Sequence, residues 1–491
     1  MAPHNKKILF IVIDQLRADC LNGALAAHVN LPNLQALQGD AVSFSNHFTV
    51  TNPCGPARVS LLTGQYAMNH RAVFNGAPLA KGTPNLATEV RKAGYEPLLF
   101  GYTDTAGDPR FHHPNDPATG DDEALMEGFN ERVEMRYKKS IPWRAYLKAK
   151  GYDIPAYEDF YNPVPENPGQ PAQPQDPAFY TAEDSDTAFL TNSLLQELAV
   201  RTDESWFAHL TYIRPHPPLV APVPYNRMYD PNKLPEPVKA GRQHPFTMSA
   251  GQMQPIANLV RGCDGIDESH TQTMRALYFG LATEVDHHIG RIIYFLKTSG
   301  QYDDTLIIVT ADHGEMLGDH GLWAKQHIFD PAYHVSLIIR DPAHPEQHGT
   351  KITELTESID VTPTLLDLVG LAKPKVMNGH SLRPFLAGET PSNWREYVHL
   401  ELDFTEAGLD MLKLAGLRPD QANLAILRGK SMKLVHFASG FTPLLFDLEN
   451  DPNEQSNLAD DPKYAQAMLD MTRALLSHRM QNLDRSLIDL A

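Results

Sequence analysis

The sequence predicts an α/β fold built on a large, mostly parallel sheet flanked by helices. Short apolar runs recur along the chain and are nearly continuous rather than alternating, which is typical of strands buried on both faces of a parallel sheet. Helical patterns lie between these runs, and strands that alternate with helices favour crossover connections. The runs expected as parallel strands are Ile8–Ile13, Glu96–Tyr102, Trp206–Ile213, Thr305–Thr310 and Val335–Ile339.

The clearest helix is expected from about His270 to Lys297. Its apolar residues recur at spacings of three and four, which places them on one helix face. The pattern stops at "TSG", where Gly300 is a suitable C-terminal cap.

Two segments depart from the alternation of strands and helices. Pro155–Pro177 contains seven prolines and is expected to be irregular. It could be a domain linker, but matching strands on both sides favour an insertion, over about residues 103–180, in one domain. After about Val376 two short strands with turn residues between them indicate a small antiparallel sheet. We therefore expect a main α/β domain over residues 1–375 and a smaller α+β subdomain over residues 376–491.

The charge of the chain disfavours two classes of partner. The 491 residues include 42 basic and 60 acidic side chains, which gives a formal charge of -18. Nucleic acid and anionic membranes require a basic face, so neither is expected as a partner. A small anionic substrate remains compatible, because one cationic pocket can lie within an acidic protein.

Cysteine usage and apolar runs indicate a soluble cytoplasmic protein. Cys20, Cys54 and Cys263 are an odd number and widely spaced, so no disulfide framework is expected. The N-terminal apolar run is too short for a signal peptide and has no cleavage site after it. No run of eighteen apolar residues occurs, so no transmembrane helix is expected.

Polar side chains gather where the expected strands end. Asp14 and Gln15 follow the first strand, and Asp312 and His313 follow "LIIVTA". Ligands of open α/β sheets bind beyond the carboxyl ends of the strands. Two carboxylates, an amide and an imidazole suit Mn²⁺, Mg²⁺ or Ca²⁺. Each residue alone could equally form a turn or cap, but together, at the ends of two central strands, they favour a metal site.

Cys54 lies between prolines in "NPCGPAR", just before an expected short helix "ARVSLLTG". Pro56 suits a first helical turn, so the thiol is expected at the positive end of the helix. Such an end attracts anions and lowers a thiol pKa. A lone cysteine is more often an inert buried residue, but Arg58 adds a fixed positive charge beside the sulfur and favours a functional site.

These residues resemble a known family. Cys54 to Arg58 fit the C-x-P-x-R motif of the formylglycine-dependent sulfatases, and "LLTG" fits its extended form. Further segments resemble the branch of phosphonate monoester hydrolases and related arylsulfatases, within the alkaline phosphatase superfamily. The resemblance runs from Ile8 into the C-terminal tail through "VIDQLRAD", "MNHRAVFNGAPL", "RPHPP", "ADHGEMLGDHGLWAK" and "FDLENDPNEQSNLADDP". It implies that residues 1–375 form the catalytic domain of a sulfatase-like fold.

The resemblance also implies roles for individual residues. One divalent ion (Mn²⁺ or Ca²⁺, or else Zn²⁺) would be bound by Asp14, Gln15, Asp312, His313 and Cys54 after its oxidation to formylglycine. Arg58 would orient the formylglycine, and Asn75 would hydrogen-bond the substrate, although "NG" could equally be a turn. Tyr102, His216 and Lys325 would contact the charged oxygens of the substrate, with His216 or Lys325 protonating the departing alcohol.

One position departs from the family pattern. Many sulfatases carry a lysine and a histidine in the loop that here reads Tyr102-Thr103-Asp104. The phosphonate hydrolases also carry the tyrosine, and the resemblance implies a threonine where Asp104 stands. A tyrosine in place of a lysine removes a positive charge, which favours a singly charged ester over a dianion. An aspartate would add a negative charge at this position, so Asp104 is given no role in the site.

The expected activity is hydrolysis of phosphonate monoesters and phosphodiesters, and also of sulfate monoesters, through a covalent intermediate on residue 54. An arylsulfatase is the nearest alternative, and a catalytically silent protein that binds anions or assembles with partners is a different one. The resemblance further implies maturation by a formylglycine-generating enzyme or an equivalent. It also implies a homotetramer or dimer formed through the C-terminal region.

Overall fold

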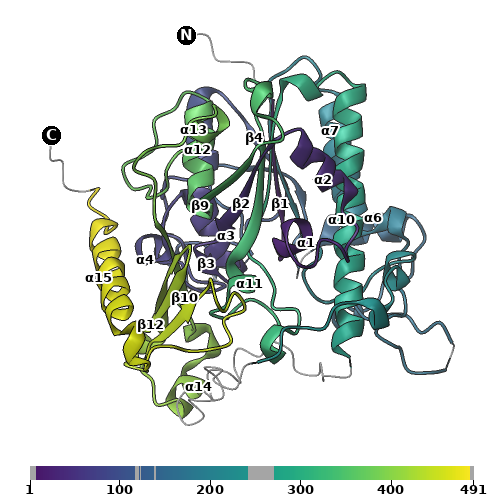
Figure 1. The fold of residues 1–491 in the computed structure, drawn as a ribbon. Helices are drawn as coiled ribbons and strands as arrows, with labels where there is room; N and C mark the ends of the chain where they lie inside the picture. Colours follow the sequence, from purple (N-terminus) through teal and green to yellow (C-terminus); the bar gives the residue numbers. More distant parts are fainter. Residues whose placement is uncertain are drawn as a thin grey trace.

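An eight-stranded sheet forms the centre of the molecule (Figure 1). The structure is a computed structural model that describes residues 7–116, 121, 123–137, 140–167, 169–240 and 270–486. Strands pair in the order β5-β4-β6-β1-β7-β8-β2-β9. Their bounds are β1 Lys7–Ile13, β2 Val42–Phe48, β4 Pro97–Gly101, β5 Asn130–Glu134, β6 Phe207–Tyr212, β7 Thr305–Ala311, β8 His334–Arg340 and β9 Lys351–Glu357.

The mostly parallel sheet is confirmed, but the expected direction of Val335–Ile339 is wrong. This run forms β8, which is antiparallel to both of its neighbours, β7 and β2. All other neighbouring pairs in this sheet are parallel. A continuous apolar run indicates that a strand is buried on both faces of its sheet, but it does not indicate the direction of the strand. The chain returns from β7 to β8 without a long crossover helix, so β8 runs back beside β7.

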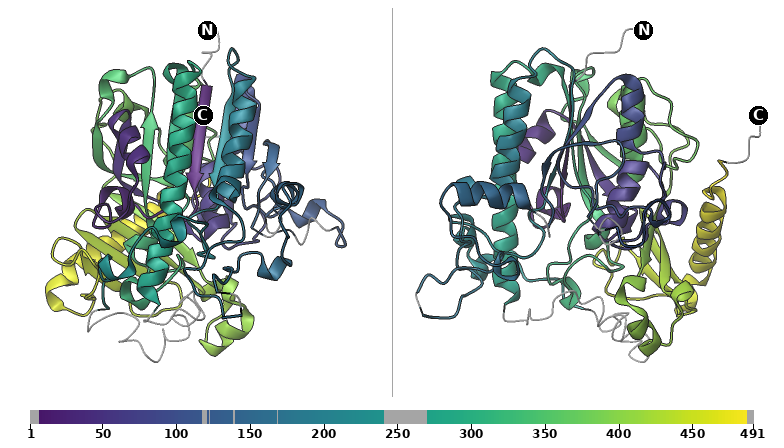
Figure 2. Two further views of the ribbon diagram at one scale, coloured as in Figure 1. Left: turned by 90° about the vertical axis from the view of Figure 1, so that its right-hand side faces the viewer. Right: turned by 180° about the vertical axis from the view of Figure 1, so that it is seen from behind.

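Helices cover both faces of this sheet, and β1 divides its side chains between them (Figures 1 and 2). Leu9, Ile11 and Ile13 pack in the core that contains residues of α2 (Pro32–Gly39), α7 (Asp186–Ala199) and α10 (Thr271–Thr298). Ile8, Phe10 and Val12 pack in the core with α3 (Cys54–Thr63), α5 (Leu86–Val90) and α12 (Val361–Leu368). Burial on both faces explains the continuous apolar sequence of β1.

A second, five-stranded sheet has the order β13-β12-β11-β10-β3. Its antiparallel part confirms the expected C-terminal sheet, whereas β3 (Thr51–Asn52) pairs parallel with β10 (Tyr397–Asp403). The remaining strands are β11 Asn423–Gly429, β12 Met432–Phe437 and β13 Leu444–Asp447. Because β3 directly precedes Cys54, this sheet holds the chain at the start of α3.

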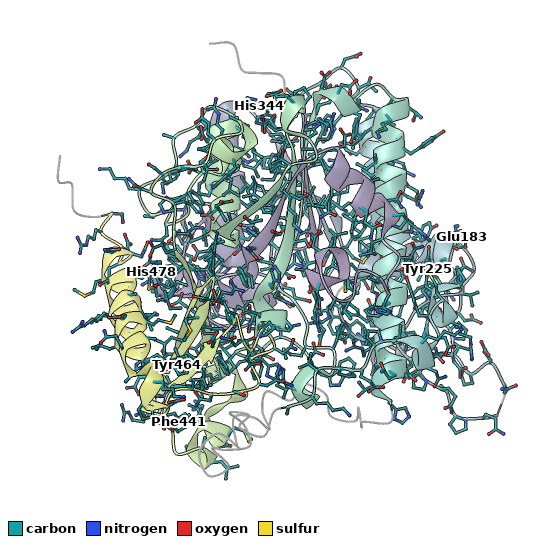
Figure 3. All side chains as sticks on the ribbon, viewed as in Figure 1. Glu183, Tyr225, His344, Phe441, Tyr464 and His478 are labelled. Atoms are coloured by element: carbon teal, nitrogen blue, oxygen red, sulfur yellow. The ribbon has the colours of Figure 1, made fainter. Side chains whose placement is uncertain are left out.

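The C-terminal helix α15 (Ala465–Gln481) packs against the second sheet through Met471 and Leu475. Figure 3 labels His478 on this helix, and its ring stacks on that of His399 in β10 with centroids 4.8 Å apart.

The expected helix at His270–Lys297 is confirmed as α10, within one residue at each end. Gly300 follows it in the left-handed region, at φ 72°. Of the described part of Pro155–Pro177, only Tyr157–Asp159 forms a regular element, a short 3₁₀ helix. The strands β2, β5 and β9 were not predicted, because their polar residues interrupt the apolar pattern.

Candidate active site

The polar residues after β1 and β7 lie side by side. The two strands are parallel neighbours, and Ile13 pairs with Ala311 at their carboxyl ends. Asp14 and Asp312 therefore leave the sheet at the same point. The backbone N–H of Gln15 donates to Oδ1 of Asp312 over 3.0 Å, which joins the two loops.

Cys54 reaches this point from the start of α3. It is the first residue of that helix, with Pro53 at the N-cap, and its side chain is buried. Its Sγ lies 3.2 Å from Nε2 of His313. The thiol therefore lies at the positive end of a helix, as predicted. The expected lowering of its pKa is wrong, because burial, followed by the negative charge of Asp14, raises the pKa of Cys54 well above its usual range. The other described cysteine, Cys20, is also a free thiol, whereas Cys263 lies outside the described residues.

Four side chains converge to form a possible cation site. Ligand atoms of Asp14, Cys54, Asp312 and His313 all lie within 4.8 Å of one another, and all four residues are buried. Nε2 of His313 is 3.6 Å from Oδ1 of Asp14 and 3.7 Å from Oδ2 of Asp312. Oδ1 of Asp14 is buried and accepts no hydrogen bond from any described residue. An orphaned carboxylate oxygen facing an imidazole and a second carboxylate fits a divalent cation.

Electrostatics also favours a cation at this cluster. Burial, followed by repulsion from Asp312, raises the pKa of Asp14. Burial lowers the pKa of His313 to about 4, so its imidazole is neutral at pH 7 and can act as a ligand. A positive ion between the carboxylates would relieve the repulsion that raises the pKa of Asp14.

Arg58 is a buried cation that binds both carboxylates. Its Nη2 lies 3.2 Å from Oδ2 of Asp14, and its Nε lies 3.0 Å from Oδ2 of Asp312. Nη1 donates to the hydroxyl of Thr211 in β6 over 2.6 Å. The guanidinium also lies over the ring of Tyr102, 4.1 Å from its centroid. Arg58 thus fixes the carboxylates, and their negative charges offset its own.

Tyr102 and Asn75 both approach the site. The hydroxyl of Tyr102 donates to Asp14 and accepts from Nη2 of Arg58 over 2.9 Å. Oδ1 of Asn75 accepts from the backbone N–H of Gly55 over 2.9 Å, which satisfies a free donor in the first turn of α3. Both predicted substrate contacts are therefore adjacent to the cysteine or to its carboxylate neighbours.

Lys325 and His216 contact each other, and Lys325 also contacts the side chain of Gln15. Nζ of Lys325 donates to Oε1 of Gln15 over 2.8 Å and lies 2.9 Å from Nε2 of His216. Nδ1 of His216 faces the carbonyl of Pro217, and a carbonyl only accepts, so Nδ1 carries the hydrogen. Nε2 then accepts from the ammonium of Lys325.

The charges of this pair follow from its surroundings. Burial, followed by the charge of Lys325, lowers the pKa of His216 well below its usual range. Burial alone would lower the pKa of Lys325, but the net shift is upward because Cys54, Asp14 and Asp312 favour the ammonium. Lys325 therefore holds a proton at pH 7, and His216 is neutral.

Two further residues of the site were not predicted. Glu315 accepts from Nε2 of Gln15 and from the backbone N–H groups of Leu317 and Ala324, at 3.0 and 2.6 Å. It joins Gln15 to the loop that carries Lys325, and its position in "DHGE" was an available signal. Thr211 gave no signal, since a threonine inside a strand is ordinary.

Asp104 also lies near the cysteine. It is buried, and its φ of 51° is in the left-handed region, which is uncommon for a residue other than glycine. Burial raises the pKa of Asp104 to about 8, so its carboxyl is mostly neutral at pH 7. The negative charge that the sequence suggested at this position is thereby reduced.

Across the described residues, no helix combines the length and the apolar character that crossing a bilayer requires.

Comparison with protein-family models gives two matches. The Sulfatase model matches residues 6–371, which include every residue of the site described above. The model of the C-terminal region of N-sulphoglucosamine sulphohydrolase matches residues 318–481.

Individual proteins are similar over nearly the whole chain. The multifunctional alkaline phosphatase superfamily protein PehA of Trinickia caryophylli is 39% identical over 505 residues, covering 98% of this chain and 96% of the relative. The phosphonate monoester hydrolase SpPMH from Silicibacter pomeroyi superposes with a TM-score of 0.93 at 52% identity, covering 98% and 96% of the two chains. The phosphonate monoester hydrolase of Agrobacterium radiobacter superposes with a TM-score of 0.92 at 38% identity, covering 98% of this chain and 97% of the relative.

Proposed function

The chain belongs to the sulfatase family of the alkaline phosphatase superfamily, and within it we propose a metal-dependent hydrolase of phosphonate monoesters and phosphodiesters that also accepts sulfate monoesters. The nucleophile is residue 54, after its cysteine has been oxidised to formylglycine by a generating enzyme or an equivalent. The observation that carries this proposal is the convergence of Cys54 with Asp14, Asp312 and His313 at the start of α3.

The metal would be held by Asp14, Gln15, Asp312, His313 and residue 54. The side chain of Gln15 also contacts Lys325 and Glu315. A divalent cation bound there would lower the pKa of a hydroxyl on residue 54 and screen the charge of the substrate. Arg58 keeps the two carboxylates in place through its contacts of 3.2 and 3.0 Å.

Formylglycine in its hydrated form carries two hydroxyls on one carbon. One hydroxyl, as its oxyanion, attacks phosphorus or sulfur and forms a covalent ester on residue 54. The bond from phosphorus or sulfur to the alcohol breaks, and the alkoxide takes a proton. The second hydroxyl then gives its proton to solvent as the carbonyl reforms, the C–O bond to the product breaks, and Lys325 regains a proton from solvent. Phosphonate or sulfate leaves with its own P–O or S–O bond intact, and water restores the hydrate.

Lys325 supplies the proton in this proposal. The resemblance allowed either His216 or Lys325 as the donor. The hydrogen-bond pattern favours Lys325, because Nδ1 of His216 is engaged with the carbonyl of Pro217 and its Nε2 accepts from Lys325. An ammonium held between Gln15 and His216 is a positioned general acid.

The charge of the site supports a singly charged ester as the substrate. The charge of Arg58 is offset by two carboxylates, whereas Lys325 has the neutral partners Gln15 and His216. Arg58 and Lys325 together offset the two carboxylates, so the net positive charge offered to the substrate is that of the metal. The solved relatives at 52% and 38% identity are phosphonate monoester hydrolases, which supports the same class.

Arylsulfatase activity is the second candidate, and the Sulfatase model over residues 6–371 favours it. Purified enzyme assayed with phenyl phosphonate monoesters, phosphodiesters and aryl sulfates ranks the candidates by kcat/KM. The proposal expects the highest value for a phosphonate monoester. A much higher value for the sulfate would make arylsulfatase the main activity, and no turnover of any ester would favour a silent anion-binding protein.

We further propose a cytoplasmic enzyme that assembles as a homotetramer or dimer through its C-terminal region. Both statements rest on the sequence and its resemblance, and light scattering on the full chain tests the assembly.

A further inference from the structure

Arg214 is a fully charged side chain that lies buried beside the site without belonging to it. It follows β6 and precedes His216 by two residues, and it is 1% exposed. Burying a guanidinium is costly unless its surroundings compensate for the lost water. Arg214 contacts the loop that carries His216 and is paired with Asp186 in α7.

The guanidinium binds the loop through two carbonyls. Nη1 donates to the carbonyl of His216 over 3.2 Å and to that of Pro218 over 2.8 Å. These carbonyls flank Pro217, whose own carbonyl accepts from Nδ1 of His216. Arg214 therefore fixes the peptide groups that determine which nitrogen of His216 carries the hydrogen.

The guanidinium is itself anchored from two other segments. Its Nε lies 3.1 Å from Oδ2 of Asp186, in the first turn of α7, and its Cζ lies 5.0 Å from the ring centroid of Tyr161. The ring of Tyr161 is stacked in turn on that of Tyr137, with centroids 5.7 Å apart. The planar guanidinium of an arginine has several N–H donors and can make these contacts at the same time, whereas the ammonium of a lysine cannot.

We infer that Arg214 is a positioning residue that keeps His216 aligned on Lys325 and thereby controls proton delivery to the departing alcohol. This inference rests on the proposed function, in which Lys325 is the proton donor. Without Arg214 the loop carbonyls lose their donor, His216 loses its fixed orientation, and Nζ of Lys325 loses the acceptor that lies 2.9 Å away. Within the part of the chain that the structure describes, the hydrogen bonds, ion pair and ring contact of Arg214 involve His216, Pro218, Asp186 and Tyr161 and not the cluster around Cys54, so Arg214 acts through His216.

The test is the dependence of rate on the leaving group. An alcohol of low pKa departs without a proton, whereas an alcohol of high pKa needs one. We therefore compare the 4-nitrophenyl and phenyl esters of one phosphonate in wild type and Arg214→Gln. The inference expects kcat/KM for the 4-nitrophenyl ester to fall by less than about 3-fold and that for the phenyl ester by roughly 10- to 100-fold.

Arg340→Gln is a matched control. Arg340 is also buried, donates from Nη1 to the two carbonyls of Tyr302 and Thr305, and lies over an aromatic ring at 3.9 Å. These contacts are at the amino end of β7, opposite the site. The control should lose stability but keep the wild-type ratio of the two kcat/KM values.

Asp186→Asn is the second variant, because it loosens the anchor of Arg214 while preserving size. It should change the ratio in the same direction by a smaller factor, and it covers the case in which Arg214→Gln does not fold. The inference would be overturned if kcat/KM fell equally for both esters. It would also be overturned if every folded variant among Arg214→Gln and Asp186→Asn kept the wild-type ratio of the two kcat/KM values. Wild-type enzyme that hydrolyses neither ester would overturn the proposed function, and the inference with it.

Discussion

Nε2 of His313 lies 3.2 Å from Sγ of Cys54, although 259 residues separate them in the chain. The contact joins the end of β7 to the start of α3, and the two carboxylates of Asp14 and Asp312 complete the cluster. Residue 54 is thus presented to a set of cation ligands rather than to an ordinary general base.

Replacing Cys54 by serine should trap the covalent intermediate. A serine ester has no second hydroxyl on its carbon, so it cannot expel the product by reforming a carbonyl. We expect turnover to fall by roughly 10⁴-fold or more, with release of up to one alcohol per protein molecule. Rapid-mixing kinetics measures the release, and intact mass spectrometry detects the adduct. Sustained turnover by Cys54→Ser would contradict the proposed release step.

Replacing Lys325 by methionine should remove the proton donor while keeping a similar shape. The expected loss in kcat/KM is about 100- to 10,000-fold for esters of weakly acidic alcohols and smaller for 4-nitrophenyl esters. Steady-state kinetics across a series of phenols checks this. The exposed Lys430, in the turn after β11, is the matched control, and Lys430→Met should behave as wild type. Equal losses for all leaving groups would indicate that Lys325 binds substrate without protonating it.

Removing the metal should lower both activity and stability. A cation that binds only the folded state at a hundredfold excess over its Kd adds about 2.7 kcal/mol to the free energy of unfolding. Dialysis against a chelator should therefore lower the Tm, and metal analysis should find one divalent ion per chain beforehand. Asp312→Asn should weaken this response, whereas the exposed Asp304→Asn should preserve it. A Tm that is the same with and without chelator would count against a bound ion.

Acid should destabilise the fold through buried histidines. Burial lowers the pKa values of His47, His70 and His209 to about 3, against the usual 6.5. Below about pH 6.5 the unfolded chain takes up protons that the folded chain excludes, so stability falls as pH drops towards 3. At pH 5 each of these histidines lowers the free energy of unfolding by about 2 kcal/mol, and this effect disappears above pH 7.

Urea unfolding at pH 7.5 and pH 5 measures this difference. His209→Phe keeps an aromatic ring between Phe10 and Phe129, which stack on it at 4.7 and 5.5 Å. Its loss of stability between the two pH values should be smaller by about 2 kcal/mol. The exposed His436→Gln should show the wild-type difference. A His209→Phe variant with the full wild-type pH dependence would refute the assignment.

Much of the fold and of the site's location could be predicted from the sequence. Asp14 and Asp312 follow apolar strands, and parallel strands bring their carboxyl ends to one edge of a sheet. The direction of β8 could not be predicted, because burial on both faces looks the same for either direction. The contact between Lys325 and His216 could not be predicted either. The geometry of their loops, and not their spacing in the sequence, brings Nζ of Lys325 to 2.9 Å from Nε2 of His216.

The chemical state of residue 54 tests the central claim most directly. Mass spectrometry of the peptide that contains Cys54, in protein produced by the organism that encodes it, reports that state. The account predicts a residue in which one oxygen replaces sulfur and two hydrogens are lost, and which reacts with hydrazides as an aldehyde does. An unmodified cysteine in protein that hydrolyses the esters at full rate would contradict it.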